Sequence, residues 1–236
     1  KGIVKRDVVQ IISKGTIVNN ESLIEYENNY IGSLVIFNNA YGLSYSDIST
    51  GELYVQILEP NISKVVSEVI NVGLKEVVVN NKVDQNIISI LKRQFKLVVT
   101  VHDSFEVIGY DHIYSDLKDI RMIETLKHLL SYIDQTQKRS LSHFQKANVR
   151  EENQYLKMDV HTKRNLELTE TLRLKERNHS LIWLLDKTKT AMGSRLLKKY
   201  IENPLIDKDE INRRYDVVET LIKEFIIKSD LQTNLQ

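Results

Sequence analysis

The sequence predicts an α/β unit with a mixed sheet, followed by an all-α segment. In the first half, short β-branched runs alternate with apolar residues at helical spacing, whereas only helical spacing remains from residue 117 onward. Eight Gly and two Pro in 236 residues favour long elements with short connections. Apolar residues make up 42% and charged residues 28% of the chain, a balance that allows a buried core.

The first half is expected to open with antiparallel strands. A β-branched stretch over residues 3–13, which ends at Gly15, is interpreted as a strand that closes an earlier unit. After a polar link, three strand-like runs are separated only by short turn sequences, which is typical of a meander: residues 31–37, 41–47 and 52–58.

Helices and further strands are then predicted to alternate. Apolar residues from Ile62 to Ile70 recur at helical spacing, and Gly73 follows where a C-terminal cap is expected. Three more elements complete the unit: a strand over 76–79, a helix over 84–91 and a strand over 97–101. The resulting order, β-β-β-α-β-α-β, resembles the RNase H architecture, an RNase H-like mixed sheet covered by helices.

The second half is expected to be helical throughout. One apolar stripe runs over residues 122–133, and residues 181–185 form an apolar cluster around the single tryptophan. In the last predicted helix, Asp207 and Glu210 have the spacing of a capping box, and one apolar face follows as far as Phe225.

These patterns divide the chain into three parts. The end of an earlier domain and a linker are expected at 1–19, the α/β unit at 20–116 and the helical segment at 117–236. Residues 1–119 carry 11 basic and 15 acidic side chains, whereas residues 120–236 carry 22 and 17. A basic second half is compatible with a salt-sensitive, non-specific DNA contact, although solvated helix faces of mixed charge explain the same counts.

Composition also bears on compartment and membrane contact. Cysteine is absent, which excludes disulfide frameworks, thiolate nucleophiles and Cys-ligated zinc. Because a signal-peptide pattern is also missing, a cytoplasmic protein is expected. No apolar run approaches the roughly 20 residues that span a bilayer, so no membrane partner is expected.

The residue patterns of known catalytic sites are largely missing from the sequence. A metal-dependent nuclease of RNase H type needs carboxylates on neighbouring strands, yet the run 31–37 has none, and Asp47 and Glu52 fit the role of turn residues. No Gly-x-x-x-x-Gly-Lys-Ser/Thr loop or Gly-x-Ser-x-Gly elbow occurs, and the six histidines lack metal-ligand spacing. We therefore predict no catalytic, cofactor-binding or metal-binding residues in this chain.

Two blocks of sequence carry a family resemblance. Residues 158–167 match the pattern Asp-x-x-Thr-x-Arg-Asn-Leu-Glu, and residues 185–197 match Leu-Asp-x-Thr-x-Thr-x-Met-Gly-x-Arg, followed by Asn-Pro-Leu at 203–205. In this order they resemble the core domain of the MutS family of DNA mismatch-repair proteins. Residues 46–51 resemble a hairpin of the family's connector domain, and residues 8–16 resemble the strand that ends its mismatch-binding domain.

The family-motif residues are expected to serve in packing and helix capping. Thr190 is placed to cap a helix that begins at Ala191, and Asp159 to cap the helix that follows it. Leu166 and the aliphatic part of Arg164 are expected to pack inward. The complete set is Asp159, Thr162, Arg164, Asn165, Glu167, Asp186, Thr188, Thr190, Met192, Gly193, Arg195 and Pro204.

The resemblance implies an internal piece of a longer, dimeric ATPase that recognises mispaired DNA and recruits MutL. It assigns a connector for MutL and inter-domain contacts, and part of the core that couples the ATPase to the DNA clamp. The family's Phe-x-Glu wedge and its phosphate loop do not occur here, so this piece is expected to be no enzyme. ATP and Mg²⁺ belong to the parent protein. MutL-contact residues stay unassigned, because the stretch 100–117 departs from relatives.

Overall fold

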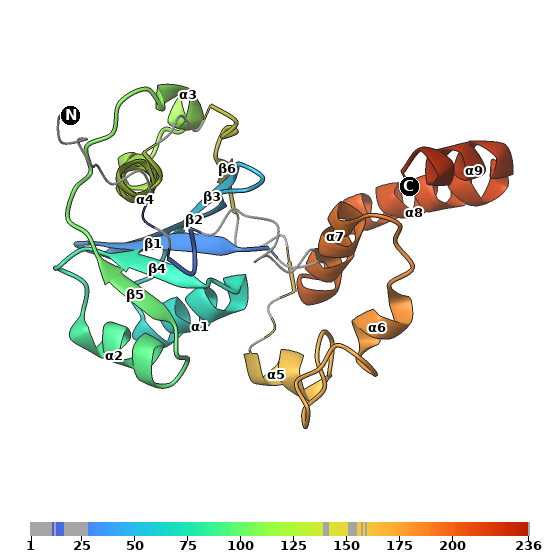
Figure 1. Ribbon diagram of the computed structural model, residues 1–236, viewed down its shortest axis with the longest axis horizontal. Helices are drawn as coiled ribbons and strands as arrows, with labels where there is room; N and C mark the ends of the chain where they lie inside the picture. Colours follow the sequence, from blue (N-terminus) through green and yellow to red (C-terminus); the bar gives the residue numbers. More distant parts are fainter. Residues whose placement is uncertain are drawn as a thin grey trace, which may run out of the picture. The chain divides into compact units, whose positions relative to one another are not determined.

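The computed structural model describes residues 11, 13–16, 28–138, 142–150, 155–156, 158 and 160–235 (Figure 1). Among these residues, the chain divides into two compact units between Arg150 and Tyr155, named unit 1 and unit 2. The strand predicted over 3–13 and the part expected at 1–19 lie largely outside the described residues, and Asp159 lies outside them altogether.

Unit 1 contains a mixed sheet with the strand order β5-β4-β1-β2-β3-β6. The first three strands form antiparallel hairpins, whereas β4 runs parallel to β1, β5 to β4 and β6 to β3. This arrangement confirms the predicted mixed sheet and adds one strand, β6, that was not predicted. The bounds are β1 Tyr30–Phe37, β2 Ala40–Asp47, β3 Glu52–Leu58, β4 Glu76–Val79, β5 Val98–Val101 and β6 Asn148–Val149.

Helices cover both faces of this sheet. In Figure 1, α1 and α2 lie on one face and α4 on the other, and each face has its own buried apolar cluster. Asn61, Asp84 and Asp119 cap the N-termini of α1, α2 and α4, and Gly73 is the C-terminal cap of α1, as predicted, in a left-handed conformation. The bounds are α1 Ile62–Val72, α2 Gln85–Arg93, α3 Asp111–Tyr114 and α4 Ile120–Gln137.

The boundary predicted between residues 116 and 117 needs correction. Helix α4 was expected in the helical segment, but it packs on the sheet, with Leu126, Leu129 and Ile133 fully buried in the second cluster of unit 1. An apolar helical stripe shows that a helix seeks burial, yet it does not distinguish a sheet face from another helix as the partner. The sequence pattern therefore placed α4 in the wrong unit.

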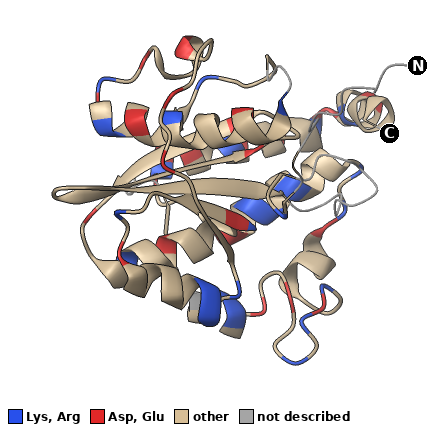
Figure 2. Ribbon diagram, turned by 60° about the vertical axis from the view of Figure 1, so that its left-hand side comes forward, with Lys and Arg blue, Asp and Glu red and all other residues tan. Residues whose placement is uncertain are grey.

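The corrected boundary also changes the charge balance. Residues 1–150 carry 17 basic and 17 acidic side chains, and residues 151–236 carry 16 and 15. In the described part of unit 1, Figure 2 shows Lys and Arg interspersed with Asp and Glu. The excess of basic residues in the second half thus disappears when the chain is divided at the observed boundary. Charge therefore does not favour a DNA contact for either unit.

Unit 2 is helical, as predicted. Its helices are α5 Val160–Asn165, α6 Leu181–Leu185, α7 Ala191–Glu202, α8 Lys208–Lys223 and α9 Phe225–Asn234. The last predicted helix ends at Lys223, so Phe225 begins α9. Much of the apolar face of α8 is exposed, including Tyr215 and Ile222 at 66% and 70%. None of the described helices is long and apolar enough to cross a membrane.

Candidate functional site

The carboxylates considered for nuclease chemistry are engaged at turns. Asp47, at the end of β2, accepts hydrogen bonds from the backbone N of Asn29 at 3.0 Å and from the N and Oγ of Ser49 at 2.9 and 2.6 Å. Glu52 accepts from the Tyr54 hydroxyl at 3.1 Å. Across the described ranges, no three His, Asp or Glu side chains lie together where they could hold a metal ion. The described residues therefore contain no carboxylate cluster of the kind that a metal-dependent nuclease needs.

One carboxylate is buried at the start of β4 and organises its surroundings. Glu76 is fully buried. Its Oε1 accepts from the hydroxyls of Thr100 on β5 and Tyr132 on α4, both at 2.8 Å. Its Oε2 accepts from the Ser13 hydroxyl and from the backbone N of Gly15 at 3.2 Å. Glu76 therefore joins the segment 13–16 to the sheet and to α4.

In unit 1, a surface suited to a protein contact lies at the β5 edge of the sheet. Among the described strands, β5 pairs only with β4, so its other edge carries backbone groups without a partner among them. The following loop, residues 102–110, has no helix or strand and presents Ile108 with 95% of its surface exposed. Val101, the last residue of β5, is 57% exposed, and Phe95, three residues before the strand, is 41% exposed. Exposed apolar side chains beside an unpaired edge are typical of interaction sites. We call Val101 and the 102–110 loop the β5 edge surface.

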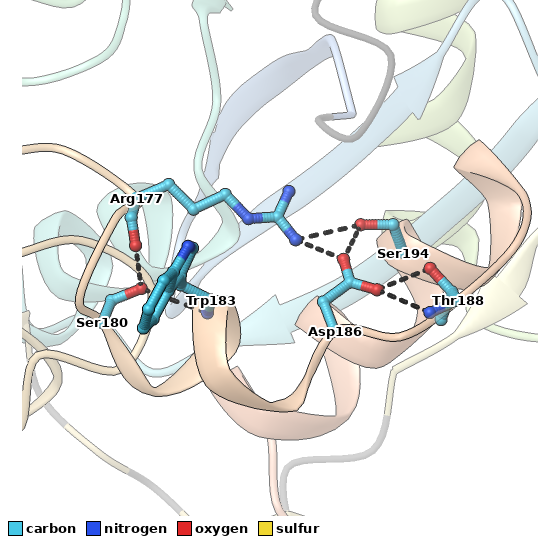
Figure 3. Close-up of polar contacts among 6 residues, drawn as sticks. All are labelled: Arg177, Ser180, Trp183, Asp186, Thr188 and Ser194. Carbon is cyan, nitrogen blue, oxygen red and sulfur yellow. Dashed lines mark hydrogen bonds and ion pairs between the residues drawn. The ribbon is translucent and has the colours of Figure 1, made fainter.

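In unit 2, the second family block folds around the carboxylate of Asp186 (Figure 3). One oxygen, Oδ2, accepts from the Arg177 guanidinium and from the Ser194 hydroxyl, whereas Oδ1 accepts from the N and Oγ1 of Thr188 at 3.0 and 2.6 Å. Burial alone raises the pKa of Asp186, but the hydrogen bonds from Ser194, Thr188 and Arg177 lower it well below its usual range. The Asp186 network thus ties the turn before α6 to the start of α7.

The other motif residues divide into helix caps and exposed positions. Thr190 caps α7, as predicted, by accepting from the backbone N of Gly193 at 3.0 Å. Glu167 follows α5 at a positive φ of 48° and accepts from the backbone N of Leu172 at 2.7 Å. Helix α7 ends at Glu202, two residues before Pro204. The exposed motif residues are Thr162, Arg164, Asn165 and Met192, and Arg195 is half-buried.

Inward packing of Arg164 and Leu166 was expected but is not found. Arg164 is exposed, and Leu166 is 57% exposed. The cluster predicted around Trp183 is also largely open, since only Ile182 is buried. Two residues of the Asp186 network were not predicted as polar partners: Arg177 and Ser194. Arg177 lies nine positions before Asp186, a separation that no local helix or turn pattern marks.

Replacing Asp186 with Asn is expected to destabilise unit 2 by about 2 kcal/mol, because the charge-assisted hydrogen bond to Arg177 is lost. The single tryptophan, Trp183, lies on α6, three residues before Asp186, so urea unfolding followed by its fluorescence reports on this unit. Asp209→Asn, at an exposed acidic position of α8, is the matched control. Equal transition midpoints for the two variants would contradict a stabilising role for the network.

The same network predicts a direction for the pH dependence. Since the pKa of Asp186 is lower in the folded state, its stabilising effect is present above the unfolded value, about 3.9, and is lost as pH falls below it. The Asp186→Asn variant should therefore lose less stability than the natural chain between neutral and strongly acidic pH.

Comparisons with known proteins match both units. A sequence model of MutS domain II matches residues 29–145, and one of MutS domain III matches residues 161–236. The DNA mismatch repair protein MutS of Bacillus cereus (strain G9842) is 39% identical over 238 residues, and that of Bacillus thuringiensis (strain Al Hakam) is 40% identical over 238. Each match covers 100% of this chain but 27% of the relative, so the chain spans about a quarter of these curated relatives.

Proposed function

Because the chain belongs to the MutS family of DNA mismatch-repair proteins, we propose that it serves mismatch repair as part of a longer protein. Unit 1 corresponds to the connector and unit 2 to the first part of the helical core. The observation that carries this proposal is that the family domains and the compact units, which were found independently, divide the chain at the same place. The two family domains match on either side of residues 146–160, and the compact units divide within that interval.

The whole protein is proposed to act as a dimer on mismatched duplex DNA and to hydrolyse ATP in a part outside this chain. Within the described residues, the sites that could be built from carboxylates are used for turns and for internal hydrogen bonds, at Asp47, Glu76 and Asp186. These contacts support a mechanical role for the two units. The chain would transmit the state of the ATPase and present a surface to partners.

We assign the proposed MutL contact to the β5 edge surface of unit 1. Its support is physical: a strand edge without a partner among the described strands, the almost fully exposed Ile108 and the exposed Val101. An apolar side chain that stays in solvent in the free protein gains by burial against a partner, by roughly 25 cal/mol for each Å² covered. A charge at Ile108 would lose that gain and would have to be desolvated.

A binding assay with purified MutL and the full chain tests this assignment. Ile108→Glu should weaken binding by at least tenfold. Ile120→Glu is the matched control, because Ile120 is also an exposed isoleucine of unit 1, at 72%, but lies at the start of α4. No detectable binding of the natural chain at tens of micromolar would refute the MutL role. Equal weakening by both variants would refute its place at the β5 edge.

A further inference from the structure

The 102–110 loop has few attachments for its length. At its start, the backbone N of His102 donates to Val79 O at 2.9 Å, and Asp103 accepts from the backbone N of Asn81 at 2.8 Å. At its end, the Tyr110 hydroxyl donates to Asp134 on α4 at 3.1 Å. Between these points, the loop is attached to the α4 side of the sheet: His102 Nε2 lies 3.1 Å from Ser131 Oγ on α4, and Val107 packs against the second buried cluster.

His128 of α4 makes the central attachment. This side chain is fully buried, and its Nε2 lies 2.7 Å from the carbonyl oxygen of His102. Its Nδ1 lies 2.6 Å from the Ser33 hydroxyl on β1, and the Phe105 ring packs against the imidazole with 4.8 Å between ring centroids. One buried imidazole thus contacts two loop residues, His102 and Phe105, and Ser33 of the sheet.

The chemistry of these partners fixes the tautomer of the neutral ring. A carbonyl oxygen can only accept, so Nε2 carries the proton and donates to His102. A neutral imidazole then leaves Nδ1 as an acceptor, and the Ser33 hydroxyl donates to it. Burial lowers the pKa of His128, which favours the same neutral form.

We infer that His128 is the positioning residue of the 102–110 loop, holding it on unit 1 through the His102 carbonyl and the Phe105 ring. The inference deepens the proposed function, because this loop carries Ile108, but its test needs no partner. A negative result for MutL binding and a negative result for loop anchoring can therefore be told apart.

A proton added at Nδ1 would disturb this anchor. Nδ1 would then face Ser33 as a donor, and a charged ring would occupy a buried site. The charged or titratable groups that act on the ring are His102 and Asp103, both from the loop, while β1 contributes only the uncharged Ser33. Acidification is therefore expected to loosen the loop before it affects the sheet.

Hydrogen exchange of the full chain tests the anchor. His128→Leu should speed loop exchange by about tenfold while exchange over β3 stays unchanged, where loop exchange is that of the two amides whose hydrogen bonds tie down the start of the loop, His102 N to Val79 O and Asn81 N to Asp103. His128→Gln, whose amide can still donate to the His102 carbonyl, should restore most of the protection. His143→Leu is the control, because His143 Nε2 also lies 2.8 Å from a carbonyl oxygen, that of Ile48, away from the loop.

The pH profile supplies a measurement that needs no substitution. After correction for intrinsic exchange, lowering pH from about 7.5 to about 5.5 should speed loop exchange in the natural chain more than in His128→Gln. The inference is overturned if His128→Leu leaves loop exchange within twofold of the natural chain. It is also overturned if His143→Leu speeds loop exchange equally, or if the natural chain and His128→Gln share one pH profile.

Discussion

Replacing Gly42 with alanine is expected to cost unit 1 about 3 kcal/mol, near the upper end for overpacking a core. A Cβ at Gly42 would lie 1.9 Å from Thr125 Oγ1 on α4 and 3.0 Å from both Thr125 Cβ and the Phe37 ring. Thr125 cannot easily move, because its Oγ1 donates to Arg121 O at 2.7 Å and its own O accepts from the Ser44 hydroxyl at 3.0 Å. The clash therefore pushes α4 off the sheet.

Urea unfolding followed by circular dichroism measures this loss, and a second substitution identifies its cause. Thr125→Ala removes the nearest atom, so the double variant should be more stable than the sum of the single effects predicts. Gly73→Ala is a control for backbone effects alone: its φ is 77°, no heavy atom lies within 4 Å of the added Cβ, and its cost should be roughly 1–2 kcal/mol. Additive effects of the two substitutions would show that the clash with Thr125 is not the cause.

The close approach at Gly42 shows what sequence patterns could and could not predict in unit 1. The hairpins were predictable because their turns lie within a few residues, as at Gly51, whose φ is 72°. The packing of α4 on β2 joins residues more than 80 positions apart, and no periodicity encodes that pairing. Strand β6 was missed because two exposed residues show no alternation. Arg150, the residue after β6, extends the pairing with β3: its backbone N donates to Val55 O at 2.9 Å, and its side chain lies 3.5 Å from Glu68.

The candidate sites follow the same division between local and distant contacts. Helix caps such as Thr190 were predictable because the cap and the amide that it accepts from are three residues apart. Asp186 was found as a motif residue, yet its ion pair with Arg177 depends on the fold of a turn that no pattern specifies. The contact between His128 and Ser33 spans 95 positions. Sequence therefore identified which residues matter locally, whereas their partners required the three-dimensional arrangement.

Replacing Glu76 with leucine is expected to destabilise unit 1 by about 3 kcal/mol or more, since its four donors lose their common acceptor in a buried site. The hydroxyls of Ser13, Thr100 and Tyr132 can turn toward other acceptors, but the backbone N–H of Gly15 is fixed in direction. The largest local effect should therefore fall on the segment 13–16.

Trypsin provides a direct measurement, because Lys14 is exposed and its peptide bond to Gly15 becomes cleavable once the segment leaves the sheet. Cleavage at Lys14 should be at least tenfold faster in Glu76→Leu, and urea unfolding should give the accompanying loss of stability. Glu106→Leu is the matched control, because Glu106 is an exposed glutamate of the same unit. If both variants are cleaved at the rate of the natural chain, the segment is held by other contacts. Faster cleavage in Glu76→Leu alone would show that one buried carboxylate fixes this part of the chain to unit 1.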